Sequence, residues 1–284
     1  MRHIMITGVS TGIGRAVANL YAQRGWSVTG TVRDALKARP DGLSTTIALE
    51  SLDLSVPGSA GLLAARVLVD HGCPDVLLSN AGIVQFGALE DVSAESLARI
   101  FQVNVFGQHE LIRALLPAMR ERRSGTIANI TSLGGTLTFP FFGAYNSTKW
   151  AFEGLSEGLW HELKPFGIRV KAIEPGFVET AIWSKALPGA DDDVSGSEEY
   201  RPYLRAMRTF ESAIAKRTAP EACALEIARA IADKSDRLRY PVAAYARGLT
   251  RARRLLGAQR LMRFFHARWM GTEAATPRRR APLA

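Results

Sequence analysis

The chain is poor in cysteine and has no long apolar run. Cys73 and Cys223 are its only cysteines among 284 residues, and their wide separation forms no metal-ligand spacing. Two isolated cysteines are typical of a reducing compartment, so we predict a cytoplasmic protein without a bound metal. No run of about 18 apolar residues is present, which argues against a membrane-spanning helix. The apolar stretch before Gly8 is too short for a signal-peptide core.

Acidic residues are almost missing from the end of the chain. The whole sequence has 36 Lys and Arg against 27 Asp and Glu, a net charge of +9. Residues 237–280 hold 12 Arg, no Lys and one acid, hence +11, which leaves −2 for the rest. A nucleic-acid interpretation would depend on the tail alone, so we expect no nucleic-acid partner. An apolar content of 47% excludes a disordered or fibrous chain.

Strand-like and helix-like segments alternate along the chain. Apolar runs indicate strands at residues 3–7, 26–32, 46–51, 75–79, 126–131, 169–173 and 239–242. Helical spacing, or proline in a first turn, indicates helices at residues 12–24, 57–69, 93–121, 144–163 and 220–232. Because crossovers between parallel strands lie over the sheet, this order predicts an α/β fold with one doubly wound parallel sheet of about seven strands and helices on both faces.

The sequence after residue 245 has a different character, so we divide the chain into a domain of residues 1–245 and a basic helical extension of residues 246–284. Arginines alternate with apolar residues at helical spacing in this extension, namely Leu255, Ala258, Met262, Phe265 and Trp269. Such a helix can contact an anionic membrane surface weakly, close a substrate pocket or pack on another subunit. We expect disorder around Arg278–Arg280. Residues 187–200 are irregular, as in a mobile loop or a plain surface insertion.

A glycine-rich turn follows the first predicted strand and opens the first predicted helix. Glycine lacks a Cβ, so the turn can approach a phosphate closely, and the helix N-terminus adds free N–H groups and positive dipole charge. The turn predicts a dinucleotide site, with an ordinary strand-to-helix turn as the alternative. Its predicted cofactor contacts are Gly8, Ser10, Thr11, Gly12, Ile13 and Gly14.

The end of the second predicted strand bears on the choice of dinucleotide. An acid at this place would bind a ribose 2′-hydroxyl, but the sequence has Val32 followed by Arg33. A guanidinium suits a 2′-phosphate, so we predict that NADP(H) is preferred and that NAD(H) is possible. Asp34 beside it weakens the argument, and a solvated Arg33 is the alternative.

Tyr145 and Lys149 lie four residues apart in a predicted helix, so their side chains share one face. The pKa of a free tyrosine is near 10, and a nearby cation favours the anion. Lowering this pKa to about 7 needs about 4 kcal/mol, which Lys149 and an oxidised nicotinamide ring can supply. The phenol then becomes an acid or base near neutral pH, and Ser132 lies 13 residues upstream of it, at the end of the strand at 126–131.

The ordered set Thr7-Gly8-x-x-x-Gly12-Ile13-Gly14, Asn80-Ala81-Gly82, Asn104, Ser132, Tyr145-x-x-x-Lys149 and Pro175-Gly176 resembles the short-chain dehydrogenase/reductase family. The resemblance covers residues 3–245 and implies a Rossmann-type fold, a nicotinamide cofactor and a homodimer or homotetramer. Arg33 and the C-terminal extension are similar to the retinol and 17β-hydroxysteroid dehydrogenase branch.

The resemblance also implies roles for single residues. It makes Asn104, Ser132, Tyr145 and Lys149 catalytic, with Asn104 holding a water that links the lysine to solvent. It further implies cofactor contacts for Asp53, Leu54, Asn80, Ala81, Gly82, Tyr145, Lys149, Pro175, Gly176, Val178 and Thr180. Among these, Asp53 is the adenine-contacting acid and Thr180 contacts the nicotinamide amide. The alternatives are a turn-capping Asp53, a helix-distorting Asn104 and a strand-end turn for Ser132.

The sequence thus predicts an oxidoreductase that interconverts a small-molecule alcohol and a ketone or aldehyde. A catalytically silent dinucleotide sensor is the alternative, which the intact Ser132, Tyr145 and Lys149 disfavour. Large apolar residues flank the predicted site, namely Phe139, Phe141, Phe142, Phe177, Ile182 and Trp183. They fit a pocket for a lipophilic substrate, or equally ordinary core packing.

Overall fold

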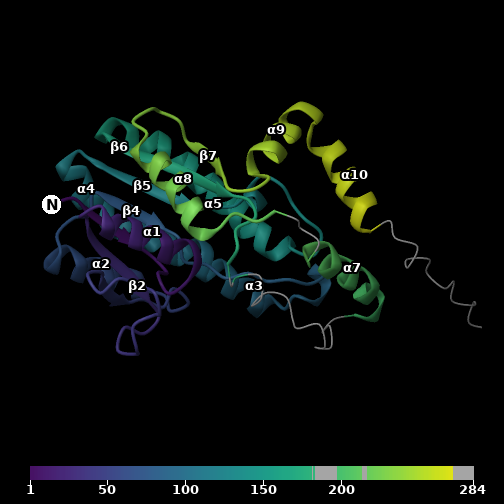
Figure 1. Ribbon diagram of the computed structural model, residues 1–284, viewed down its shortest axis with the longest axis horizontal. Helices are drawn as coiled ribbons and strands as arrows, with labels where there is room; N and C mark the ends of the chain where they lie inside the picture. The colour runs from purple at the N-terminus through teal and green to yellow at the C-terminus, as the bar shows by residue number, and fades with distance from the viewer. Residues whose placement is uncertain (181, 183–196, 213–215, 271–284) are drawn as a thin grey trace, which may run out of the picture.

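The computed structural model describes residues 1–180, 182, 197–212 and 216–270 (Figure 1). Its seven strands form one parallel sheet in the order β3-β2-β1-β4-β5-β6-β7, which confirms the predicted fold class. The strands are β1 (His3–Ile6), β2 (Ser27–Val32), β3 (Ala48–Ser51), β4 (Val76–Ser79), β5 (Gly125–Ile130), β6 (Ile168–Pro175) and β7 (Arg239–Val242). The order reverses between β1 and β4, so a crevice for a ligand is expected at their carboxyl ends.

Successive side chains of the central strands enter two different cores because a strand alternates its faces. Ile4 and Ile6 pack in one core and Met5 in the other. The first core lies under α1 (Gly12–Gln23) and α8 (Pro220–Ala232). The second lies under α2 (Ser59–Asp70), α4 (Gly107–Arg122) and α5 (Gly143–Leu163). The layers hold the carboxyl ends of the strands in fixed register, which positions the loops that follow them.

Most of the remaining helices lie toward the carboxyl edge of the sheet, whereas the short helix at residues 164–166 directly precedes β6 and lies at the opposite edge. They are η1 (Leu89–Asp91), α3 (Ala94–Phe101), the π-helix η2 (Gln102–Phe106), η3 (Leu133–Gly135), η4 (Lys164–Phe166), η5 (Glu198–Tyr200), α7 (Arg201–Ser212), α9 (Ala246–Leu256) and α10 (Ala258–Trp269). α7, α9 and α10 lie beyond the carboxyl ends of the strands (Figure 1). Within the described residues, no helix is both long and apolar enough to cross a bilayer.

Three predicted helices have different limits in the structure. The helix predicted at 57–69 begins at Ser59, because Gly58 takes a left-handed backbone (φ 87°) and leaves Pro57 outside. The helix predicted at 93–121 is interrupted by η2, where the chain widens into a π turn. The single C-terminal helix is two, because Gly257 (φ 79°) ends α9 and precedes α10.

The apolar stripe predicted on the C-terminal helix is also partly wrong. Phe265 is buried as expected, but Leu255 and Met262 are exposed, and Leu261 is buried instead. The break at Gly257 changes the phase between the two helices, so residues on either side no longer share one face. The side chain of Trp269, the tail around residues 278–280 and most of the irregular segment 187–200 lie outside the described residues.

Candidate active site

The glycine turn after β1 is closed by contacts that leave no room for side chains. A Cβ on Gly14 would lie 2.1 Å from the Gly8 carbonyl oxygen and 2.4 Å from Asn80 Nδ2. Gly8 and Gly12 have φ values of 73° and 59°, a region that favours glycine. The first amides of α1 have no partner inside the helix, as at any helix start. The turn is therefore a cradle that fits a pyrophosphate, with the exposed Ser10 and Thr11 at its surface.

The loop after β4 is tied to this turn by Thr7. The Thr7 hydroxyl accepts hydrogen bonds from the amides of Asn80 (2.8 Å) and Ala81 (2.9 Å). Asn80 Nδ2 donates in return to the carbonyl oxygens of Thr7 and Gly8 at 2.8 and 3.0 Å. Gln108 Nε2 donates to Ala81 O at 2.6 Å. Sequence reasoning assigned no role to Thr7 or Gln108; Thr7 stands inside the quoted motif, but nothing in the spacing signals Gln108.

The segment after β6 forms the opposite wall of the turn. A Cβ on Gly12 would lie 3.0 Å from Thr180 Cγ2, so the predicted nicotinamide contact faces the glycine turn. Gly176 packs against the segment that follows β7. A Cβ on Gly176 would lie 2.0 Å from Ala244 O. Val178 is buried and bridges to Thr218. The structure thus brings the Pro175–Thr180 segment to the same crevice as the glycine turn.

The predicted ribose and adenine contacts lie at the ends of β2 and β3. Arg33 is exposed beside the crevice, and its charge lowers the pKa of Asp53. Larger contributions to this lowering come from Ser55, whose hydroxyl and amide donate to Asp53 Oδ1 at 2.6 and 2.9 Å. Asp53 therefore caps the turn, whatever else it binds. Leu54 is buried against Gly107, whose Cβ would lie 2.9 Å from Leu54 O.

Tyr145, Ser132 and Lys149 meet at the carboxyl end of β5. Tyr145 and Lys149 lie one turn apart on α5, and Lys149 Nζ is 5.8 Å from the centre of the Tyr145 ring. The Ser132 side chain lies close enough to the Tyr145 phenol to lower its pKa. Ser132 Oγ also accepts from Gly134 N at 2.9 Å, which caps η3. Lys149 Nζ donates to Ile130 O at 2.9 Å, so the buried ammonium is anchored to the end of the strand.

Burial controls the protonation of this group of residues. It raises the pKa of Tyr145, and the nearby Ser132 side chain opposes the rise only in part. It also lowers the pKa of Lys149 to about 8, against the raising influence of the Glu153 carboxylate. In the protein alone the phenol is therefore protonated, and the lowering of its pKa by Lys149 together with an oxidised nicotinamide ring stays a prediction.

Asn104 lies in the π-helix η2 with its amide fully engaged by the protein. Its Oδ1 accepts from Ile83 N at 2.8 Å, and its Nδ2 donates to Ile83 O at 2.9 Å and to Thr148 Oγ1 at 3.1 Å. A Cβ on Gly82 would lie 3.1 Å from Asn104 Oδ1 and 3.8 Å from Lys149 Nζ. Asn104 thus fastens the loop after β4 to α5 beside Lys149. Its water-holding role stays a prediction.

Apolar side chains gather around Tyr145. A third apolar cluster joins the segment after β5 to α7 and α10, and its buried members are Leu133, Leu137, Phe142, Met207, Leu261 and Phe265. Half-buried Phe139, Phe141 and Tyr145 pack against it. The Phe139 ring lies 5.3 Å from that of Phe265 on α10 and 6.5 Å from that of Phe177. Ile182 is half-buried, and Trp183 lies outside the described residues.

Comparison with known proteins places these features in a family. A family model described as short chain dehydrogenase matches residues 2–190. The 3-ketodihydrosphingosine reductase of Bacteroides thetaiotaomicron is 31% identical over 84% of this chain and 87% of its own length. The mouse 17-beta-hydroxysteroid dehydrogenase type 1 is 35% identical over 77% of this chain and 67% of its own. The NADPH-dependent 3-dehydrocapnine reductase of Ornithobacterium rhinotracheale is 33% identical over 67% of this chain and 70% of its own length.

A solved structure agrees over nearly the whole chain. A short-chain dehydrogenase from Streptomyces avermitilis superposes with a TM-score of 0.77 at 34% identity, covering 95% of this chain and 96% of that one. The match extends past residue 245, so the C-terminal extension is included in the similarity.

Proposed function

Because the chain belongs to the short-chain dehydrogenase/reductase family of NAD(P)-dependent oxidoreductases, we propose that it reduces a ketone or aldehyde, reversibly, with Tyr145 as the proton donor. The observation that carries this proposal is the Tyr145 phenol, which lies near the Ser132 side chain and one turn from Lys149, beside a cradle fit for a dinucleotide.

Each residue has a defined part in the proposed chemistry. The bound nicotinamide supplies or accepts the hydride. Tyr145 keeps its proton in the protein alone because burial raises its pKa, so the phenol has a proton to give to a developing alkoxide. Ser132 holds the carbonyl oxygen near the phenol. Lys149, fixed by Ile130 O, places a positive charge where the phenolate forms.

Removal of one hydroxyl tests this assignment. Tyr145→Phe should lower kcat by about 10²–10⁴-fold, the usual contribution of a positioned acid, with dinucleotide Kd unchanged. Steady-state oxidation of NADPH with a carbonyl library, together with fluorescence titration of the dinucleotide, measures both. Near-native turnover would contradict the role of Tyr145. Dinucleotide binding by the wild type without turnover of any carbonyl would favour the silent sensor.

We further propose that NADP(H) is the preferred dinucleotide. Arg33 is exposed at the end of β2, while the Asp34 carboxylate turns toward its own loop, where it accepts from Leu36 N at 3.0 Å and lies 3.8 Å from Lys37 Nζ. The relative named as NADPH-dependent supports the same preference. Arg33→Ala should raise KM for NADPH at least tenfold and leave KM for NADH unchanged. Lys37→Ala, a loss of the same charge in the same loop, is the control. A clear preference of the wild type for NADH would overturn the argument.

The substrate in this proposal is lipophilic. The apolar cluster beside Tyr145 supports it, and two relatives are named for the reduction of 3-ketodihydrosphingosine and of 3-dehydrocapnine. We expect activity with steroid, retinoid or long-chain ketones. Activity confined to small polar polyols would contradict this substrate class.

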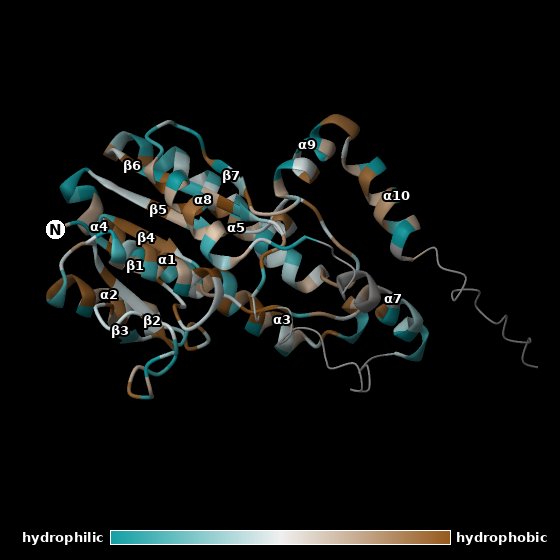
Figure 2. Ribbon diagram, viewed as in Figure 1, coloured by the Kyte–Doolittle hydropathy of each residue, from teal (hydrophilic) through white to brown (hydrophobic). Residues whose placement is uncertain are grey.

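We also propose weak contact of α9 and α10 with an anionic membrane surface. Residues 246–270 contain seven Arg and no acid. Exposed apolar side chains accompany them, namely Leu255, Leu256, Met262 and Phe264, and the corner between the two helices is apolar in Figure 2. Phe264→Ser should reduce co-sedimentation with phosphatidylglycerol vesicles, while phosphatidylcholine vesicles should bind neither form. Equal binding of both vesicle types would contradict the charge argument.

We further propose that the protein forms a homodimer or homotetramer, which light scattering tests. The cytoplasmic location stays a prediction.

A further inference from the structure

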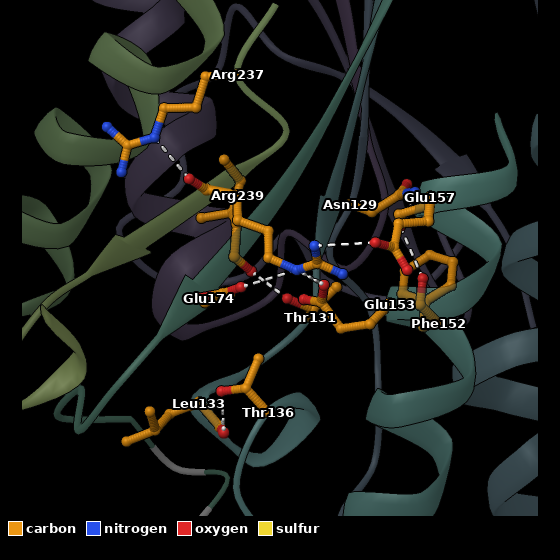
Figure 3. Close-up of polar contacts among 12 residues, drawn as sticks. Asn129, Thr131, Leu133, Thr136, Phe152, Glu153, Glu157, Glu174, Arg237 and Arg239 are labelled. Carbon is orange, nitrogen blue, oxygen red and sulfur yellow. Dashed lines mark hydrogen bonds and ion pairs between the residues drawn. The ribbon is translucent and has the colours of Figure 1, made fainter. Parts of the chain in front are cut away.

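Two buried glutamates face one arginine behind the active site (Figure 3). Glu153 lies on α5, one turn after Lys149, Glu174 lies near the end of β6, and Arg239 begins β7. Arg239 Nε donates to Glu153 Oε2 at 2.9 Å and lies 3.5 Å from Glu174 Oε1. The Glu153 side chain is 5% exposed and that of Glu174 is 0% exposed. One guanidinium thus faces two carboxyl groups that are out of contact with water.

The hydrogen bonds of this cluster are incomplete for two ionised carboxylates. In the part of the chain that the structure describes, Glu153 Oε1 and both Glu174 oxygens accept no hydrogen bond. The neighbouring Thr131 hydroxyl donates to Ile173 O at 2.8 Å, and its side chain lies close enough to Glu153 to oppose, in part, the rise that burial causes in the pKa of that carboxyl. A buried acceptor without a donor is costly, and a buried charge more so. A proton on one carboxyl removes one charge and provides one donor.

Other charges around the cluster do not remove this imbalance. Glu157, on the exposed side of α5, also contacts Arg239, at 3.2 Å from Nη1. Arg237, two residues before β7, and Arg253 of α9 act on Glu174 from a distance, and Asn129 of β5 and Thr131 just after it are neutral. Burial is the largest influence: it raises the pKa of Glu153, and it raises the pKa of Glu174 to about 7, assisted by the Glu153 charge and opposed by Arg239.

The cluster is connected to the active site through Glu153. Residues four apart on a helix share one face, so Glu153 follows Lys149 on the same side of α5, with its carboxylate bound to Arg239 and the Lys149 ammonium bound to Ile130 O. Gly135 of η3 packs against both residues, since its Cβ would be 3.0 Å from Glu153 Cγ and 3.0 Å from Lys149 O. The negative charge of Glu153 raises the pKa of Lys149 against the effect of burial.

We propose that Glu153 is a positioning residue for the Tyr145–Lys149 pair: its carboxylate, held by Arg239 and sharing one proton with Glu174, keeps Lys149 positively charged. That this charge matters for turnover rests on the proposed function. That Glu153 keeps Lys149 charged does not depend on the proposed function. The proposal can therefore be tested without substrate or cofactor.

The first experiment measures the protonation of Lys149 directly. The chain has seven lysines, so lysine labelled with ¹³C at Cε gives a simple NMR spectrum, assigned with Lys149→Met. Glu153→Gln should lower the pKa of Lys149 by about one unit or more, because it removes an opposite charge nearby. Glu157→Gln, which removes the exposed carboxylate on the same guanidinium, should leave it unchanged. An unchanged Lys149 pKa in Glu153→Gln overturns the proposal.

The second experiment uses the wild type and does not depend on how a variant folds. Glutamate labelled with ¹³C at the carboxyl carbon should show one group that titrates near pH 7, and Glu174→Gln should remove that signal. Titration of every glutamate below about pH 5 would exclude the shared proton.

The pH profile of kcat/KM then separates this proposal from the proposed function. Glu153→Gln should move the alkaline limb to lower pH with unchanged Kd for NADPH. A shifted Lys149 pKa in an enzyme inactive on every carbonyl would defeat the proposed function alone. Turnover with an unshifted limb would defeat the positioning role alone.

Discussion

The absence of a Cβ atom at its glycines decides how closely the turn after β1 can approach a phosphate. Gly14 is the tightest of its glycines, because a Cβ there would lie 2.1 Å from Gly8 O, a backbone atom that cannot move without opening the turn. The requirement comes from packing, since the structure shows no left-handed φ for Gly14, unlike Gly8 and Gly12.

Gly14→Ala should therefore abolish measurable dinucleotide binding and lower the melting temperature. Fluorescence titration with NADPH and thermal unfolding measure the two effects. Gly154→Ala is the control: it lies within α5 with nothing within 4 Å of its Cβ and should stabilise the protein by about 0.5–1 kcal/mol. Normal NADPH affinity of Gly14→Ala would show that the turn relaxes more easily than its geometry indicates.

The protonation of Glu174 also affects stability. Its pKa is about 7 in the folded protein against 4.5 for the ordinary group, so between these values the folded state binds a proton that the unfolded state has lost. Stability then falls as pH rises from about 4.5 to 7 and stays low above that. Glu174→Gln, which mimics the neutral acid, should be more stable than wild type at pH 8 and lose about 2–3 kcal/mol of this advantage by pH 5. Urea unfolding at the two pH values measures it, and a pH-independent difference would contradict the raised pKa.

Among the elements, the π-helix η2 has the most direct connection to the site. The extra residue in its turn places Asn104 against the backbone of Ile83, which would otherwise have a free N–H and a free C=O in the protein interior. Polar residues inside π turns are frequent at functional sites. Here the turn couples the loop after β4 to the face of α5 that carries Lys149.

Asn104→Ala should cost about 1–3 kcal/mol of unfolding free energy, because two half-buried backbone groups of Ile83 lose their partners. It should also lower kcat, as the loop beside Lys149 loosens. Phe106→Ala in the same π segment, with an exposed side chain, should change stability by less than about 0.5 kcal/mol. Denaturant unfolding of both variants measures the two changes in stability. If Asn104 served activity alone and did not anchor the loop, Asn104→Ala would be as stable as wild type.

At the level of the whole molecule, the C-terminal extension completes the apolar surroundings of Tyr145. Phe265 of α10 reaches Phe139, while its neighbour Phe264 points outward and is 60% exposed. One helix thus has a buried face that packs toward Phe139 and an exposed apolar face, the one that we propose contacts a membrane surface.

Phe265→Ala should detach α10 from the domain, speed hydrogen exchange in residues 258–269 at least tenfold and raise KM for lipophilic ketones. Phe264→Ala should change neither quantity, because its side chain contributes little to the docked helix. Hydrogen exchange followed by mass spectrometry measures the first effect. Equal protection of α10 in both variants would show that Phe265 does not hold it.

The fold and the chemistry of the site follow from short-range patterns in the sequence. Alternating burial, helical spacing and the separation of Tyr145 from Lys149 depend on neighbours along the chain, which is why the seven strands and the shared face of α5 could be predicted. Strand and helix limits failed where one glycine, Gly58 or Gly257, took a left-handed backbone that spacing alone does not reveal.

What the sequence determined by itself was the order of the strands and helices, the glycine turn and the pair on α5, because these are local. Only the tertiary structure decided which distant side chains meet: Thr7 with Gln108, Asn104 with Ile83, and Arg239 with Glu153 across 86 residues. It also decided the protonation of Tyr145 and Lys149. Burial sets those values, and burial is a property of the packed chain rather than of any segment.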